Sequence, residues 1–170
     1  MSEEPQVQRE ILWAPWREAY ISRDSEPEGC VFCFDPAEDE RRLVLWRSSE
    51  AFVLLNFFPY SNGHLLVLPV RHVADPTELT LQEWSEIHKG LTRGIKALRQ
   101  AFEPQGFNLG MNLGSFAGAG VANHLHVHVV PRWNGDTNFM TVLGGTRVLC
   151  QDLVRTYEVL KAQFDAVGRD

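Results

Sequence analysis

The sequence of 170 residues lacks the long apolar run that a membrane-spanning helix needs. Such a helix takes about 20 mostly apolar residues, and the longest runs, 51–55 and 65–70, each end at a polar residue or a turn. Residues 1–10 are acidic and polar, whereas a secretory signal begins basic and continues apolar. We therefore expect a soluble, cytoplasmic protein with no membrane partner.

Positive charge and cysteine are also scarce. Sixteen Lys and Arg residues stand against 22 Asp and Glu residues, a net charge of −6. No overall positive field exists to hold a nucleic-acid backbone, so we expect no nucleic-acid partner and only a local site for any polyphosphate. The three cysteines, Cys30, Cys33 and Cys150, are an odd number, which argues against a disulfide framework in a reducing compartment.

The length and the hydrophobic pattern predict a single α+β domain over residues 1–170, with 1–28 as an N-terminal extension. Apolar runs and turn signals predict strands at 43–46, 51–56, 64–70, 106–112 and 124–130. The capping box Thr80-x-x-Glu83 begins a long helix with an apolar stripe that reaches Phe102. A second stripe predicts a C-terminal helix at about 148–166. Strands on both sides of the long helix favour an antiparallel sheet of about five strands.

Residues 124–130, which read His-Leu-His-Val-His-Val-Val, place three imidazoles on one face of a strand. A single strand histidine is usually a half-buried filler, but three in alternation indicate chemistry or binding. Such a row suits a three-histidine metal site or attack on phosphorus by one histidine. The glycine-rich segment 110–120 offers small residues and backbone N–H groups, which phosphates prefer. The pattern therefore favours phosphate chemistry.

The same run matches the motif H-φ-H-φ-H-φ-φ, with φ apolar, at every position. The chain is thereby identified as a member of the histidine triad (HIT) family of nucleotide hydrolases and transferases. The similarity extends from the turn 29–33 through Asn56 and Gly63-His64 to Pro131. The flanks 12–17 and 132–139 resemble the branch that includes bacterial diadenosine tetraphosphate phosphorylases. The resemblance implies a HIT-like fold.

The resemblance also implies a role for each matching residue. The central histidine of the family is the nucleophile, which here is His126, and it forms a covalent nucleotidyl-histidine at the α-phosphorus. His128 would hydrogen-bond the phosphoryl oxygens, and His124 completes the catalytic triad. The nucleotide-binding positions are then Asn56 for the ribose hydroxyls, Asn112 near ribose and phosphate, Ser115 near phosphate, and His128.

The Cys30-x-x-Cys33 pair is half of a zinc knuckle and lacks two ligands. Several HIT relatives and the related galactose-1-phosphate uridylyltransferases pair such cysteines with a histidine of a Pro-x-x-His turn and with the first triad histidine. By that resemblance the remaining ligands are His72 and His124, and the zinc is structural. The alternative is two reduced thiols in a buried turn.

Three functions remain open from the sequence. The first is an enzyme that cleaves diadenosine tetraphosphate with phosphate or water as acceptor. The second is an adenosine phosphoramidase-type mononucleotide hydrolase. The third is a nucleotide-binding protein with incidental activity. Relatives that hydrolyse dinucleoside polyphosphates often carry Gln where this chain has Gly120. Arg132 would either place a positive charge near the polyphosphate leaving group or belong to a solvated turn. The resemblance further implies a homodimer formed through the long helix and an edge strand.

Overall fold

The structure, a computed structural model, describes residues 29–136 and 151–167. The expected N-terminal extension 1–28 and Cys150 lie outside these ranges. The strands are β1 (Val44–Arg47), β2 (Ala51–Leu55), β3 (Leu65–Pro69), β4 (Gly106–Gly110) and β5 (Val127–Arg132). The helices are α2 (Leu81–Phe102) and α4 (Leu153–Val167), with short 3-10 turns η2 (Pro36–Glu38), η3 (Pro76–Glu78) and η4 (Ser115–Ala117).

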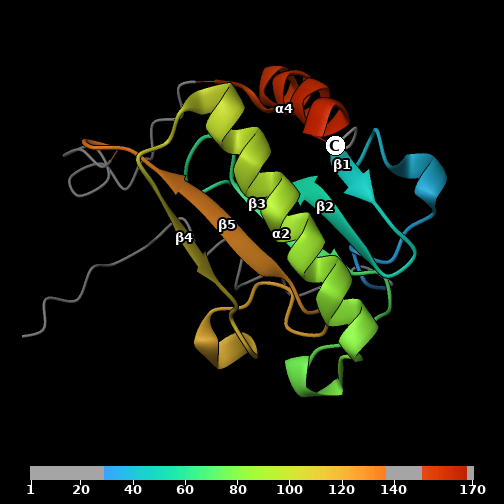
Figure 1. The fold of residues 1–170 in the computed structure, drawn as a ribbon. Coiled ribbons are helices and arrows are strands. Elements are labelled where there is room, and N and C mark those ends of the chain that lie inside the picture. Colours follow the sequence, from blue (N-terminus) through green and yellow to red (C-terminus); the bar gives the residue numbers. More distant parts are fainter. Residues whose placement is uncertain (1–28, 137–150, 168–170) are drawn as a thin grey trace, which may run out of the picture.

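The five strands form one sheet in the order β1-β2-β3-β5-β4, and every neighbouring pair is antiparallel (Figure 1). The predicted α+β fold and the meander of the first three strands are confirmed. Strand β5 lies between β3 and β4, with His128 opposite Leu66 and Val129 opposite Leu65. Residues opposite each other share a face, so His128 and Val129 point to different sides of the sheet.

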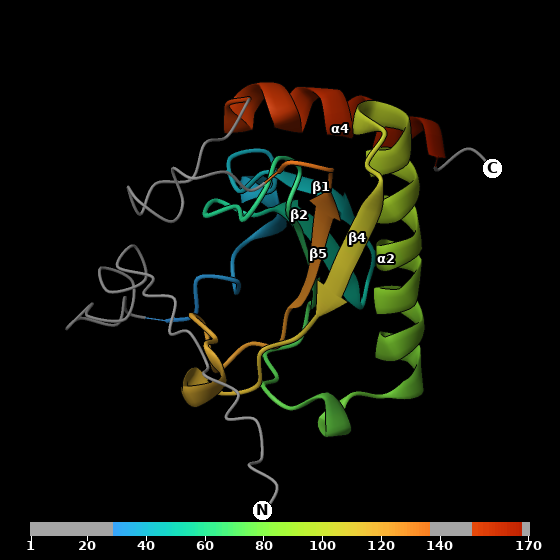
Figure 2. The ribbon, with the colours of Figure 1, turned by 90° about the vertical axis from the view of Figure 1, so that its left-hand side faces the viewer.

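Helix α2 covers the face that carries Val129. It begins at the predicted capping box, in which Thr80 and Glu83 bond each other's backbone N–H groups. Gly90 lets the helix approach the sheet, since a Cβ atom there would lie 2.9 Å from Cγ1 of Val67. Figure 2 shows α2 on one side of the sheet, with the segment before β1 and the turn η4 on the other. Within the described ranges, no helix has the length and apolar character to cross a membrane.

The C-terminal helix begins at Leu153 and not near 148. Asp152 caps it, because its carboxylate accepts the N–H of Arg155 at 2.9 Å. A capping side chain of this kind marks the start of a helix. Leu160 and Phe164 are fully buried and join the core beneath α2.

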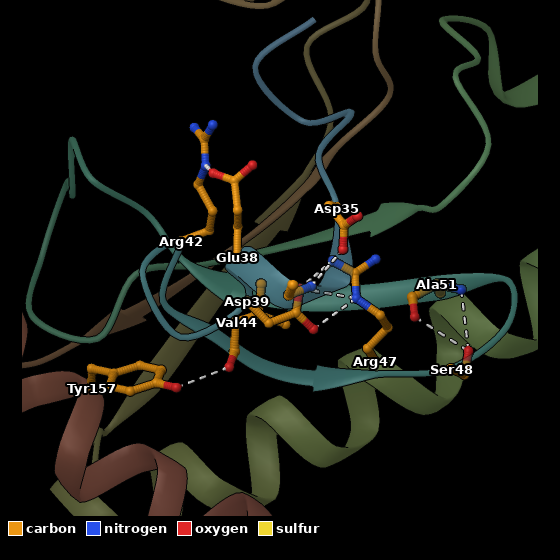
Figure 3. Close-up of polar contacts among 10 residues, drawn as sticks. Asp35, Glu38, Asp39, Arg42, Val44, Arg47, Ser48, Ala51 and Tyr157 are labelled. Carbon is orange, nitrogen blue, oxygen red and sulfur yellow. Dashed lines mark hydrogen bonds and ion pairs between the residues drawn. The ribbon is translucent and has the colours of Figure 1, made fainter.

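Helix α4 also covers the edge strand β1 (Figure 3). The hydroxyl of Tyr157 donates to the carbonyl of Val44 at 3.2 Å, and Nζ of Lys161 donates to the carbonyl of Leu45 at 3.2 Å. The pairing of β1 with β2 is irregular at this point, as in a β-bulge. Edge strands are commonly protected in this way.

Strand β5 spans Val127–Arg132, whereas the sequence predicted a strand over 124–130 that ends before Pro131. His124 and His126 therefore precede the strand. Pro131 has no N–H group to donate to a neighbouring strand. It is accommodated because the pairing of β3 with β5 ends at Val129, so β3 needs no hydrogen bond from Pro131. Its carbonyl accepts a hydrogen bond from Oγ of Ser61 at 2.8 Å.

Candidate active site

His126 is buried and its ring is held by the backbone. Its side chain is 6% exposed, and Nδ1 lies 2.9 Å from the carbonyl oxygen of His124. A carbonyl only accepts, so the proton of the neutral ring is on Nδ1 and the lone pair is on Nε2. Burial lowers the pKa of His126, while the bond to the carbonyl opposes that effect. His126 is thus held as a neutral imidazole with the lone pair on Nε2.

A second histidine, His64, orients His128. The backbone N–H of Tyr60 donates to Nδ1 of His64 at 3.0 Å, so the proton of a neutral His64 is on Nε2. That Nε2 lies 3.0 Å from Nδ1 of His128, which must then accept. The proton of a neutral His128 is consequently on Nε2, so that nitrogen is a hydrogen-bond donor.

No role for His64 was predicted from the sequence, although it lies in the Gly63-His64 pair that matches the family. It is fully buried at the start of β3, where a single histidine resembles an ordinary core residue. The predicted ribose ligand Asn56 contacts it, with Nδ2 3.2 Å from Nδ1 of His64. Oδ1 of Asn56 accepts the N–H of Phe58. In this structure Asn56 therefore supports the chain of histidines.

The four predicted metal ligands come together from three separate parts of the chain. Sγ of Cys30 lies 3.3 Å from Nδ1 of His124, and Sγ of Cys33 lies 3.3 Å from Nδ1 of His72 and 3.6 Å from Nδ1 of His124. All four ligand atoms lie within 4.8 Å of one another. Burial and the neighbouring Cys30 raise the pKa of Cys33 to about 11.

These atoms fit a tetrahedral zinc ion. With Zn–S near 2.3 Å and Zn–N near 2.0–2.1 Å, a sulfur and a nitrogen in a tetrahedron are separated by about 3.6 Å. The three S–N distances of 3.3, 3.3 and 3.6 Å match that separation. Nε2 of His124 donates to the carbonyl of Pro69 at 3.0 Å, which leaves the lone pair of Nδ1 toward the sulfurs.

An ion pair anchors the loop that carries His72. The guanidinium of Arg71 donates to both carboxylate oxygens of Glu83, at 2.7 and 3.0 Å. Glu83 is 2% exposed and also accepts the N–H of Thr80. The start of α2 thereby holds the residue next to a predicted metal ligand, an arrangement that the capping box alone did not indicate.

A cleft of about 480 Å³ lies beside His128 on the face away from α2. Its lining includes the predicted ligand Asn112 and the cation Arg132. Arg132 donates to both oxygens of Asp136, at 2.6 and 2.9 Å, and to Oδ1 of Asn108 at 2.7 Å. Asp136 and Asn108 therefore hold Arg132, whose side chain is 46% exposed at the rim of the cleft.

The predicted phosphate ligand Ser115 is exposed and begins η4 in the glycine-rich loop. Gly114 and Gly118, with φ of 79° and 87°, adopt the left-handed conformations that glycine favours. The N–H groups of Ala117 and Ala119 bond the carbonyl of Gly114, and that of Gly118 bonds Ser115. These three N–H groups close the turn.

Known proteins share this arrangement of sequence and fold. The family model described as HIT domain matches residues 38–135. A protein of Mycobacterium tuberculosis named AP-4-A phosphorylase is 38% identical over 168 residues, covering 94% of this chain and 85% of that protein. Protein hit of Bacillus subtilis is 30% identical over 115 residues, covering 68% of this chain and 79% of that protein.

A solved structure is similar as well. The crystal structure of a Zn-bound histidine triad family protein from Mycobacterium smegmatis has a TM-score of 0.66 and 26% sequence identity, and it covers 82% of this chain and 96% of that chain. Together with the family match over residues 38–135, these likenesses support the identification made from residues 124–130. The chain belongs to the HIT domain family.

Proposed function

We propose that this protein splits diadenosine tetraphosphate by phosphorolysis through a covalent intermediate on His126. The observation that carries the proposal is the 2.9 Å contact between Nδ1 of His126 and the carbonyl of His124, which leaves Nε2 as the nucleophile. The similarity to a protein named AP-4-A phosphorylase, at 38% identity over most of the chain, supports this substrate.

The proposed reaction has two displacements. Nε2 of His126 attacks the α-phosphorus, the bond from that phosphorus to its bridging oxygen breaks, and ATP leaves with the bridging oxygen and the electron pair. An oxygen of inorganic phosphate then attacks the same phosphorus and breaks the bond to Nε2, which yields ADP and free His126. The carbonyl of His124 stabilises the positive ring while the intermediate exists.

The remaining predicted residues have supporting roles in this proposal. His128, oriented by His64, donates from Nε2 to a phosphoryl oxygen. Asn112 contacts the nucleotide from the cleft, and Ser115 contacts phosphate from the glycine-rich loop. For Asn56 we propose the predicted ribose contact through the N–H of Nδ2 that does not face His64.

We further propose that Cys30, Cys33, His72 and His124 hold a structural zinc ion. The fit of their ligand atoms to a tetrahedron supports this cofactor. A closed site with four protein ligands supplies rigidity and no catalytic water. It would tie the turn 30–33 to the segment that carries His126, and thereby hold the carbonyl of His124 in place.

The test is turnover of diadenosine tetraphosphate with and without millimolar inorganic phosphate, with products separated by chromatography. Phosphorolysis yields ATP and ADP and requires phosphate. A rate that does not change with phosphate, with ATP and AMP as products, would identify water as the acceptor. Cleavage of adenosine phosphoramidate alone would select the mononucleotide alternative, and failure to cleave either compound would leave a nucleotide-binding role.

The proposal also includes one cytoplasmic domain over 1–170 and a homodimer. Among the described residues, strand β4 pairs only with β5, and exposed apolar side chains lie along and just beyond its free edge, with Leu109 53% and Leu113 49% exposed. An open edge with apolar side chains favours pairing with a second copy. Size-exclusion chromatography with light scattering measures the assembly, and a monomer at micromolar concentration would contradict it.

A further inference from the structure

The cleft beside His128 is placed at one end of the histidine row. The ring centroids of His126 and His128 lie 5.0 Å apart, so the cleft begins one imidazole away from the attacking residue. The other end of the row is covered by Phe32, whose ring lies 5.6 Å from those of both His124 and His126. A substrate that extends past His128 therefore enters the cleft.

The charge of the cleft disfavours a polyphosphate as its main occupant. Its cation Arg132 is paired through two hydrogen bonds with its carboxylate Asp136. The pair is neutral as a whole, and a polyphosphate with several negative charges would meet Asp136 as well as Arg132. The cleft thus suits a polar but uncharged group.

The remaining lining offers what a nucleoside needs. The guanidinium of Arg132 can only donate, so the amide oxygen Oδ1 of Asn108 is the atom that faces it. The amide nitrogen Nδ2 of Asn108 therefore points away from Arg132 and can donate a hydrogen bond to a ligand. Met111 and Val130 add apolar surface, and Tyr60 is an aromatic wall whose ring lies 19° from parallel to that of His128. The volume of about 480 Å³ falls within the range of small-molecule sites.

We infer that this cleft binds the second nucleoside of a dinucleoside polyphosphate, the one that departs with the leaving group. The inference rests on the proposed function, in which His126 takes the first nucleotide and releases the second. Asn108 donates to the base or ribose, and Met111 packs against the base. The polyphosphate chain lies between the cleft and His126.

The experiment compares two substrates that share the reacting adenylyl group. Diadenosine tetraphosphate carries a second nucleoside and adenosine tetraphosphate does not. For Asn108→Ala and for Met111→Ala we expect kcat/KM with diadenosine tetraphosphate to fall about 3- to 10-fold, as for loss of one hydrogen bond or of a comparable apolar contact. With adenosine tetraphosphate it should stay within about twofold, which also shows that each variant is folded.

The control is Gln100→Ala, which removes an exposed amide from helix α2 on the far side of the sheet and should change neither value. An equal loss with both substrates, or no loss with diadenosine tetraphosphate, overturns the inference while the proposed function stands. Turnover of neither substrate by the unmodified protein overturns the proposed function and the inference together.

Discussion

The ion pair of Arg71 and Glu83 joins the loop before His72 to the start of helix α2, and its removal has a calculable effect on stability. The hydrogen bonds from Arg71, followed by those from Thr80, lower the pKa of Glu83 from 4.5 to about 2. Each pKa unit corresponds to about 1.36 kcal/mol, so the depression contributes at most about 3.4 kcal/mol to folding. Because the side chain of Arg71 is 48% exposed, solvent screens the pair, and we expect about 2 kcal/mol.

The perturbation is Glu83→Gln. The amide oxygen of Gln can still accept the N–H of Thr80. Its NH₂ group, however, would face the N–H groups of Arg71, and two donors cannot form a hydrogen bond. The free energy of unfolding at pH 7 should therefore fall by about 2 kcal/mol. The matched control is Glu158→Gln, since Glu158 is exposed and pairs only with Arg155 among the described residues; its effect should be below about 0.5 kcal/mol.

The sign of the pH dependence follows from the lowered pKa. A carboxylate with a depressed pKa stabilises the folded state above its unfolded pKa of 4.5, and the effect disappears as the pH falls toward about 2. With an unfolded pKa of 4.5 and a folded pKa of about 2, about six-tenths of the stabilising free energy remains at pH 3.5. Urea denaturation with excess chelator, at pH 7 and at pH 3.5, measures both differences. The reasoning is refuted if Glu83→Gln behaves like Glu158→Gln at pH 7, or if its effect does not shrink in acid.

Three further predictions concern the site itself. His126→Asn should lower turnover by several orders of magnitude and leave the affinity for diadenosine tetraphosphate within about tenfold, as measured by single-turnover kinetics and calorimetry; near-normal turnover would contradict the covalent mechanism. His64→Phe should lower kcat about 10- to 100-fold without loss of bound metal, because His128 loses its donor, and an unchanged kcat would make His64 a packing residue. Elemental analysis should find about one zinc per chain and, in Cys33→Ser, much less; below about a tenth of an equivalent in the unmodified protein, the cysteines would be simple thiols.

The sequence alone determined the features that depend on local order. Alternating apolar residues and turn signals located the five strands, and the pair Thr80 and Glu83 located the start of α2, because periodicity and capping act between residues close in the chain. The histidine row was equally local, since alternation brings His124, His126 and His128 to one side wherever the backbone is extended. The ends of two elements depend on longer-range contacts: strand pairing sets the start of β5 at Val127, and the Asp152 cap sets the start of α4 at Leu153.

Only the tertiary structure decided which distant residues meet. Nothing near Cys33 in the sequence indicates that His72 lies 3.3 Å from its sulfur, and resemblance alone suggested that contact. The link from His64 to His128 depends on the pairing of β3 with β5, and the charge balance of the cleft depends on the ion pair of Arg132 with Asp136. Such contacts follow from how strands and loops pack, whereas hydrophobic period and side-chain chemistry are already present in the unfolded chain. The sequence therefore specified the chemical groups, and the fold specified their partners, proton positions and net charge.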